Sequence, residues 1–209
     1  MTEELEKIID NDDSEMNYFV DPTAKMVGEI EIGKGCGIWP GSIIDADKSK
    51  VHLDNDVYVM PNSSIESTED REVNIGEGSF ISPGARLEGC RLGKNTFVGM
   101  DAVVMPGVEL GDNVLVTNGS IIKSGTKIPD NSVVKGDPAE VVDEVDKAII
   151  EKISKIRTHL NWKSKEYQIM IKRGEMYDVY DTPKRPDEIL EEHKKKVSEK
   201  LSSMDDVLE

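Results

Sequence analysis

The chain has 209 residues, of which 33% are charged and 37% are hydrophobic, and its formal net charge is −16 at pH 7. This acidity excludes nucleic acid and anionic membrane surfaces as main partners, because both repel such a chain. It has no apolar run of about 18 residues, so we expect no transmembrane helix. The N-terminal stretch MTEELEKIIDNDDSE is acidic and lacks an apolar region, which argues against a signal peptide and leaves the cytoplasm as the predicted location.

In chain order, an acidic segment over residues 1–17 is followed by a repeat in which aliphatic residues recur every six positions. The four blocks of this repeat contain 19 hexads: Val20, Met26, Ile32, Ile38, Ile44; Leu53, Val59, Ile65; Ile75, Ile81, Leu87; and Leu92, Val98, Val104, Leu110, Val116, Ile122, Ile128, Val134. Three residues after most of these aliphatics comes Gly, Asn or Asp, residue types that tolerate left-handed turn conformations. A small residue usually follows the turn residue.

A period of six fits neither an α-helix nor a strand with one exposed face, and it predicts a parallel β-helix over residues 18–137. Each hexad forms one side of a coil, and stacked rungs bury a continuous aliphatic column. With three hexads in a rung, the repeat gives roughly six rungs.

The repeat breaks at three places, where the spacing between aliphatics changes. Three residues are inserted between Ile44 and Leu53, four are inserted between Ile65 and Ile75, and one is missing in GARLEGC, between Leu87 and Leu92. Extra residues in a solenoid usually leave as loops on one face, and that face often binds something. We therefore expect the insertions to form loops.

After the repeat, the spacing of apolar residues changes to that of a helix. Pro138 is typical of a helix start, and Val142, Val145, Ile149, Ile153, Ile156 and Leu160 form an apolar stripe, so we predict a helix over 138–174 that packs along the coil. Residues 175–209 are predicted to be a linker and a charged helical tail, and 184–209 are a candidate segment for binding other proteins.

These motifs together resemble one branch of the hexapeptide-repeat proteins, the γ-class carbonic anhydrase-like family. The resemblance rests on GEIEIGKGCGIWPGSIIDAD and on the stretch from EGSFISPGARLEGC to NGSIIKSGTKIPDNSVVKGDPAEVV, and it covers about residues 18–160. It implies a left-handed β-helix and a homotrimer. The last part of the match is shared with hexapeptide acyltransferases.

In enzymes that this chain resembles, three histidines hold zinc or iron at the subunit boundary, and zinc hydrolysis chemistry needs three such ligands and an open position for water. Here the three positions are Glu66, Pro83 and Glu88. Asp45 stands where the family has an arginine nearby, and Met60 stands where the family has a glutamine. Asp47 retains the family's aspartate. The resemblance therefore implies a retained scaffold without zinc and without carbonic anhydrase activity.

Two rebuilt sites remain open as alternatives. Glu66 and Glu88 are candidate ligands, with Asp45 or Asp47, for a hard cation such as Mg²⁺ or Ca²⁺; otherwise they are polar interface residues paired with Arg71, Arg86 or Arg91. His52 is the histidine of the coil and the candidate base of a CoA-dependent acyltransferase, a family that uses histidine in this role, whereas His159 and His193 lie in the helix and the tail. Asp47 and Glu88 are further catalytic candidates.

The sequence thus favours an all-β, left-handed parallel β-helix with a C-terminal helix, assembled as a homotrimer. Cys36 and Cys90 occupy small inward positions and are interpreted as buried structural thiols. The favoured function is a binding, scaffold or complex-assembly subunit. The alternatives are an acyltransferase that binds CoA, and a metal-dependent enzyme with a carboxylate site.

Overall fold

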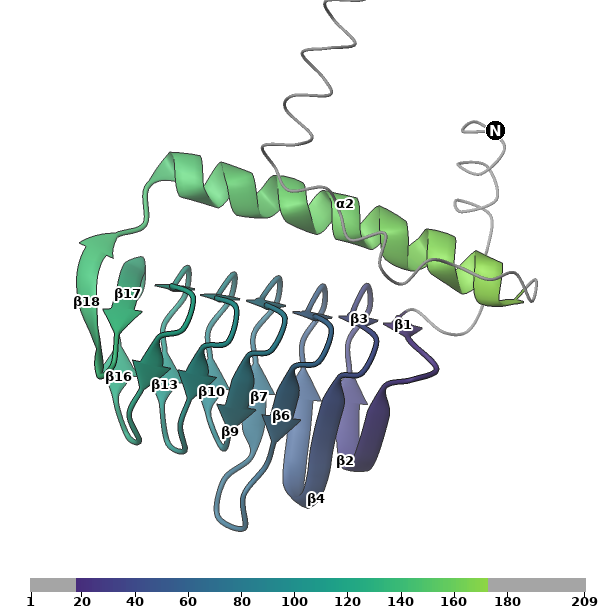
Figure 1. The fold of residues 1–209 in the computed structure, drawn as a ribbon, viewed down its shortest axis with the longest axis horizontal. Helices are drawn as coiled ribbons and strands as arrows, with labels where there is room; N and C mark the ends of the chain where they lie inside the picture. Colours follow the sequence, from purple (N-terminus) through teal and green to yellow (C-terminus); the bar gives the residue numbers. More distant parts are fainter. Residues whose placement is uncertain (1–17, 173–209) are drawn as a thin grey trace, which may run out of the picture. The chain divides into compact units, whose positions relative to one another are not determined.

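The computed structural model describes residues 18–172, in which short strands wind into a left-handed parallel β-helix (Figure 1). One face of the coil is an eight-stranded sheet. Its strands, in spatial order, are β1 (Phe19–Val20), β3 (Gly37–Ile38), β5 (Tyr58–Val59), β8 (Phe80–Ile81), β11 (Phe97–Val98), β14 (Leu115–Val116), β17 (Ser132–Gly136) and β18 (Ala139–Glu144). The expected segments 1–17 and 175–209 lie outside the described residues.

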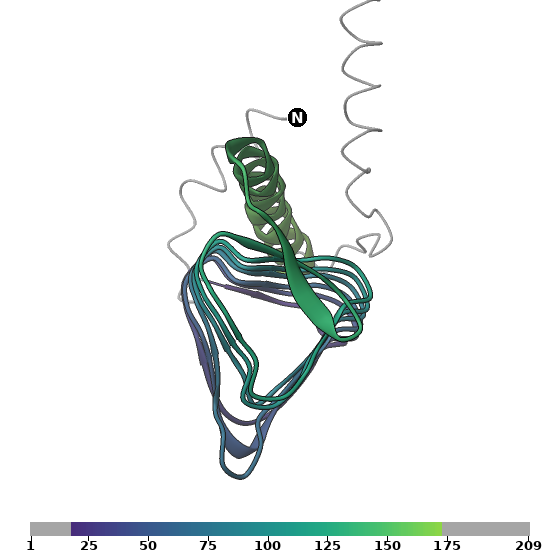
Figure 2. The same ribbon diagram turned by 90° about the vertical axis from the view of Figure 1, so that its left-hand side faces the viewer.

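The other two faces join into a single ten-stranded sheet. The second face contains β6 (Ser64–Glu66), β9 (Arg86–Glu88), β12 (Val103–Val104) and β15 (Ile121–Ile122). The third face contains β7 (Val73–Ile75), β10 (Arg91–Leu92), β13 (Glu109–Leu110) and β16 (Lys127–Ile128). The two faces are continuous because β2 (Lys25–Ile32) and β4 (Ile43–Leu53) run around the corner between them. Seen along its axis, the coil is triangular (Figure 2).

The pairing register confirms that a regular rung contains three hexads. Leu115 pairs with Phe97 and with Val133, each 18 residues away. The three breaks appear as rungs of unequal length, since Gly37 pairs with Tyr58 after 21 residues, Tyr58 with Phe80 after 22, and Phe80 with Phe97 after 17. All three breaks fall at one corner, between the second and third faces, which we call the irregular corner (residues 28–29, 46–50, 67–72 and 89–90).

The breaks at the irregular corner take three different forms. The prediction that both insertions form loops is wrong for the first one, because its residues extend β4, which stays paired with β2 through a register shift between Gly28 and Ile30. The second insertion is a projecting loop over residues 67–72 (Figure 1), closed by reciprocal backbone hydrogen bonds between Thr68 and Arg71. At the shortened rung the chain turns through Gly89, whose φ is 45°.

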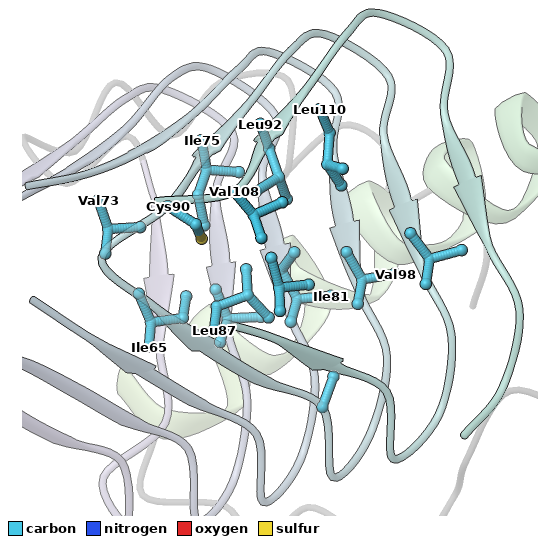
Figure 3. Packing of buried hydrophobic residues seen from close by; sticks show 14 of the residues in the cluster. Ile65, Val73, Ile75, Ile81, Leu87, Cys90, Leu92, Val98, Val108 and Leu110 are labelled. Carbon is cyan, nitrogen blue, oxygen red and sulfur yellow. The ribbon is translucent and has the colours of Figure 1, made fainter. Parts of the chain in front are cut away.

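Aliphatic side chains fill the interior of the coil. Figure 3 shows Ile65 and Leu87 from the second face meeting Val73, Ile75 and Leu92 from the third. The inward side chains of the middle rungs are nearly inaccessible: Ile65, Val73 and Ile81 are 0% exposed, and Ile75 and Leu87 are 1% exposed. The hexad spacing therefore identifies the core, and the breaks between hexads leave the core column intact.

A regular corner between the third and first faces stacks turn residues from successive rungs. Its residues, which we call the amide corner, are Gly35, Asp56, Gly78, Asn95, Asn113 and Asn131, all with φ between 55° and 73°. The Asn95 amide donates to Asn113 Oδ1 at 3.2 Å, and the Asn113 amide donates to Asn131 Oδ1 at 2.9 Å. Gly35 adopts this conformation without strain, and a Cβ there would lie 2.2 Å from Asp56 Oδ1, so a larger residue would displace the Asp56 side chain.

The C-terminal helix α2 (Lys147–Lys172) lies along the first face (Figures 1 and 2). Its start was predicted at Pro138, but residues 139–144 instead form β18, which pairs antiparallel with β17. The Arg157 guanidinium donates to the Asn95 side chain and to the Gly78 carbonyl, which joins the helix to the amide corner. No helix in residues 18–172 is long and apolar enough to cross a membrane.

Near the end of α2, an aromatic ring of the helix packs against two aromatic rings of the first rungs. The Tyr167 ring lies 5.5 Å from that of Trp39 and 6.1 Å from that of Phe19, while Phe19 and Trp39 meet edge to face at 5.6 Å. Tyr167, Trp39 and Phe19 are all buried. Trp39 is thus a packed residue at the corner that follows β3.

Candidate functional site

The carboxylates that replace two of the expected histidines form a column on the second face. Asp45 of β4 pairs with Glu66 of β6, and Glu66 pairs with Glu88 of β9. These residues are outward neighbours of the buried column Ile44, Ile65 and Leu87, because side chains alternate between the two sides of a strand. Glu66 and Glu88 are exposed, and Asp45 is half-buried. Three like charges at successive strand spacings of about 4.8 Å repel one another, and water reduces the repulsion.

The remaining residues of the expected site lie apart from this column. Pro83 is exposed in the turn that precedes β9, whereas Glu88 ends β9, so the two lie at opposite ends of one strand. Met60 is 6% exposed and belongs to the packed interior. The Asp47 backbone N–H donates to Asp45 Oδ1 at 3.0 Å, which holds these two candidates together within β4.

Within residues 18–172, no group of three or more His, Cys, Asp or Glu side chains is placed to hold a metal ion. The same part of the chain has no salt bridge between Glu66 or Glu88 and Arg71, Arg86 or Arg91. The pairing expected for the carboxylates is therefore absent within one chain. A second chain would have to supply any further ligand or counter-charge.

His52 lies on the third face between two carboxylates. Its Nδ1 is 2.9 Å from Glu31 Oε2, and its Nε2 is 3.2 Å from Asp54 Oδ1. The hydrogen bond with Glu31 is the main cause of a raised pKa for His52, and Asp54 adds to it. Both ring nitrogens are thus engaged, and the imidazolium form is favoured. A general base needs a free ring nitrogen next to its substrate, so this geometry does not favour His52 as a catalytic base.

A lysine extends the network around His52 along β2. Lys50 Nζ lies 2.9 Å from Glu29 Oε1 and 2.7 Å from Glu31 Oε1. The pKa of Lys50 is raised, and that of Glu31 is lowered, chiefly by their mutual hydrogen bond. The spacing of residues in the sequence does not predict this network. The alternation in GEIEI places Glu29 and Glu31 on one side of a strand, but only the register shift of β2 against β4 brings Lys50 to both.

The cysteines are structural, as predicted. Cys36 and Cys90 are free and buried, and the Cys36 thiol donates to the Asp54 carbonyl at 3.0 Å. Burial raises the pKa of Cys36 to about 11 and that of Cys90 to about 12. The thiolate is the nucleophile and the metal ligand, so neither cysteine is poised for chemistry at neutral pH.

The other histidines lie away from these groups. His159 is half-buried on α2, the helix that lies along the first face. His193 lies outside the described residues. The structure therefore brings Asp45, Asp47, Glu66 and Glu88 near one another and leaves His52, His159 and Pro83 apart from them.

Comparison with known sequences agrees with the repeat. The family profile described as "Bacterial transferase hexapeptide (six repeats)" matches residues 89–124. The carnitine operon protein CaiE of Escherichia coli K12 is 26% identical over 158 residues, which cover 74% of this chain and 76% of CaiE. The mitochondrial gamma carbonic anhydrase 1 of Arabidopsis thaliana is 31% identical over 96 residues, which cover 43% of this chain and 35% of that protein.

Solved structures show the same fold at lower sequence identity. A hexapeptide transferase family protein from Anaplasma phagocytophilum has a TM-score of 0.64 and 24% identity, and the match covers 72% of this chain and 92% of that one. A mutant of AntD, an N-acyltransferase from Bacillus cereus, in complex with dTDP and coenzyme A has a TM-score of 0.59 and 17% identity, and the match covers 76% of this chain and 97% of that one. At these identities the likeness is one of fold.

Proposed function

Because the chain is a hexapeptide-repeat protein similar to CaiE and to γ carbonic anhydrases, we propose that it is a homotrimeric binding, scaffold or complex-assembly subunit without carbonic anhydrase activity. The observation that carries this proposal is the identity of the residues at the three expected histidine positions. Pro83 has no side-chain atom that could bind a metal, and Glu66 and Glu88 offer only carboxylate oxygens, on an exposed face. Zinc hydrolysis sites use nitrogen-rich ligand sets in a shaped cavity.

A trimer is supported by the second face, where outward side chains of several rungs are apolar. The outward positions that pair across this face are Ile43, Ser64, Arg86, Val103 and Ile121. Ile43 is 41% exposed, and Val27 on the same face is 52% exposed. Exposed aliphatics on a flat sheet face are typical of a surface that another chain covers. Sedimentation equilibrium of the full-length chain measures this, and a monomer at micromolar concentration would contradict it.

Carbonic anhydrase activity is tested on the full-length protein after incubation with Zn²⁺, Co²⁺ or Fe²⁺. We expect stopped-flow CO₂ hydration to match the rate in buffer, and metal analysis after dialysis to find no stoichiometric metal. The triple variant Glu66→His, Pro83→His, Glu88→His is the matched control, since it restores the expected ligands on the same scaffold. Stoichiometric metal in the wild type would overturn the proposal and favour the carboxylate metal site instead.

The alternative function, an acyltransferase, predicts two effects. Binding of acetyl-CoA would raise the melting temperature of the protein, and His52→Ala would abolish turnover. We expect neither effect, because both His52 nitrogens already contact carboxylates. A saturable rise in melting temperature with acetyl-CoA would favour the acyltransferase instead.

The scaffold role predicts protein partners in the cytoplasm, the compartment that the sequence predicts and that two free cysteines suit. We expect partners to co-purify with the full-length chain from native cells and to be lost when residues 184–209 are removed. The control is a chain of full length in which the lysines of HKKK, residues 194–196, are changed to glutamine. Retention of every partner after truncation would contradict a role for the tail.

A further inference from the structure

A pocket of about 530 Å³ that is open to solvent, which we call the cavity, lies beside the projecting loop of the irregular corner, and the charged side chains that line it are exposed. Its walls come from the loop, through Glu69, Asp70, Arg71 and Glu72, and from strands of the third face, through Asn74 of β7 and Arg91 of β10. Small-molecule sites in proteins usually have volumes of about 300–1,000 Å³. The cavity is separate from the column of Asp45, Glu66 and Glu88, which faces outward from the second face.

The loop holds Arg71 in a defined position at this cavity. Reciprocal backbone hydrogen bonds with Thr68, at 3.0 and 3.2 Å, close the loop at its base. The Arg71 side chain then crosses two glycines of successive rungs. A Cβ at Gly89 would lie 3.1 Å from Arg71 Cβ, and a Cβ at Gly107 would lie 3.1 Å from the guanidinium carbon. The two glycines therefore leave the space that this side chain occupies.

Arg91 faces the same cavity from the floor. It stands between Asn74 and Glu109 in the pairing of β10 with its neighbours. Glu109 is engaged elsewhere, since Lys127 Nζ lies 3.0 Å from its Oε2. Over residues 18–172, five lysines form ion pairs of at most 3.2 Å, but neither Arg71 nor Arg91 forms one.

The carboxylates of the loop are unpaired as well. In the described part of the chain, Glu69, Asp70 and Glu72 form no salt bridge, although two arginines line the same cavity. The cavity is thus lined by uncompensated charges of both signs. A ligand with several negative charges would be repelled by the carboxylates, and a ligand with only positive charge would be repelled by the guanidiniums.

We propose that this cavity binds a small zwitterion, whose acidic group contacts Arg71 and Arg91 and whose cationic amine contacts the loop carboxylates. Arginine suits the acidic end because its planar fork donates two parallel hydrogen bonds to a carboxylate or phosphate. Asn74 adds a neutral hydrogen-bonding group to the lining of the cavity. This site depends neither on the histidine positions nor on a protein partner, so it goes beyond the proposed scaffold role.

The test is isothermal titration calorimetry of the full-length protein with three probes that share a five-carbon chain. These are δ-aminovalerate with one charge of each sign, glutarate with two negative charges, and cadaverine with two positive charges. We expect saturable binding of δ-aminovalerate with one site per chain, and binding of the other two that is weaker by about tenfold or more. Absence of δ-aminovalerate binding at millimolar concentration, or tighter binding of glutarate, would overturn the proposal.

Variants locate the binding on the two arginines. Arg71→Gln and Arg91→Gln should each raise the Kd for δ-aminovalerate by about tenfold, the loss of one charge-assisted contact. Lys34→Gln is the matched control, because Lys34 is exposed and forms no ion pair within residues 18–172 but lies beside Gly35 of the amide corner, away from the cavity and from the second face. Equal weakening by Lys34→Gln would show an effect of net charge and would refute the site.

Two further variants separate loss of contact from loss of structure. Arg71→Lys keeps the charge and most of the stem, so it should bind more tightly than Arg71→Gln while giving the same melting temperature. The triple change Glu69→Gln, Asp70→Asn, Glu72→Gln should remove the preference for δ-aminovalerate over glutarate. If the preference survives this change, the loop carboxylates do not contact the amine and the zwitterion assignment is wrong.

Discussion

The amide corner and the irregular corner bound the same coil but follow different rules. At the amide corner turn residues of successive rungs stack, and side-chain amides from Asn95 to Asn131 bond to one another. The extra and missing residues of the rungs with 21, 22 and 17 residues instead all lie at the irregular corner. The core beneath both corners is equally closed, since Cys36 is 1% and Cys90 is 2% exposed. A solenoid can therefore change its surface at one corner while the buried column stays the same.

The largest expected effect concerns the two cysteines, which allow the corners to be compared. Cys36 lies at the amide corner and Cys90 lies at the irregular corner. Both thiols are buried with raised pKa values, so reaction with a disulfide reagent requires opening of the coil. We expect native protein to react slower than urea-unfolded protein by at least about 1,000-fold, which corresponds to an opening free energy of about 4 kcal/mol. Single variants Cys36→Ser and Cys90→Ser report the corners separately. Much faster labelling of Cys90 would show that the irregular corner opens locally.

The next effect tests whether the core is packed as tightly beside the breaks as it is elsewhere. Leu87 is 1% exposed and pairs with Ile65 and Val104 beside the shortened rung. Leu87→Ala should lower the free energy of unfolding by about 2–5 kcal/mol, as in other closed cores. Urea unfolding measures this, with Val142→Ala as the control because Val142 is 55% exposed on β18. A loss below about 1 kcal/mol for Leu87→Ala would mean that the core near the break is loosely packed.

A smaller effect tests the regular corner. Asn113 has φ of 57° and bonds to Asn95 and Asn131. Asn113→Ala loses both side-chain hydrogen bonds and puts a residue that tolerates the left-handed conformation less well than asparagine at this position, so it should cost about 2 kcal/mol. Asn113→Gly loses only the hydrogen bonds and should cost less. Equal losses for the two variants would show that backbone strain has no part in this corner.

The hexads allowed the buried column and the three breaks to be predicted from sequence, because one periodic pattern records both. The strand β18 was not predictable in this way. Val142, Val145 and Ile149 have helical spacing, but the free edge of β17 pairs with residues 139–144 and overrides that preference. The same reason applies to the contacts of His52 and Lys50. They depend on a register shift between β2 and β4, and the spacing of residues within one strand does not record the register between two.

The placement of the site residues could be predicted from the sequence, but the residues that they contact could not. The column of Asp45, Glu66 and Glu88 follows from the alternation of strands once the rungs are aligned. The expected pairing of these carboxylates with arginines is absent in one chain, and Arg71 instead crosses Gly89 and Gly107. Loop conformation decides this contact, and four inserted residues without a repeat give no information about it.

The smallest expected effect is a pH dependence at the start of the coil. The pKa of His52 is raised by Glu31 of β2 and, to a lesser degree, by Asp54, while Lys50 contacts the same Glu31. A group with a raised pKa in the folded state stabilises the fold fully below its unfolded pKa of about 6.5, and this contribution is lost as pH rises through the folded value. His52 is partly exposed, so its contribution should be below about 1 kcal/mol. The free energy of unfolding, measured with urea, should fall more between pH 6 and pH 8.5 for the wild type than for His52→Gln. An equal difference would mean that the imidazolium does not hold β2 against β4, and that the backbone pairing alone fixes the first rungs.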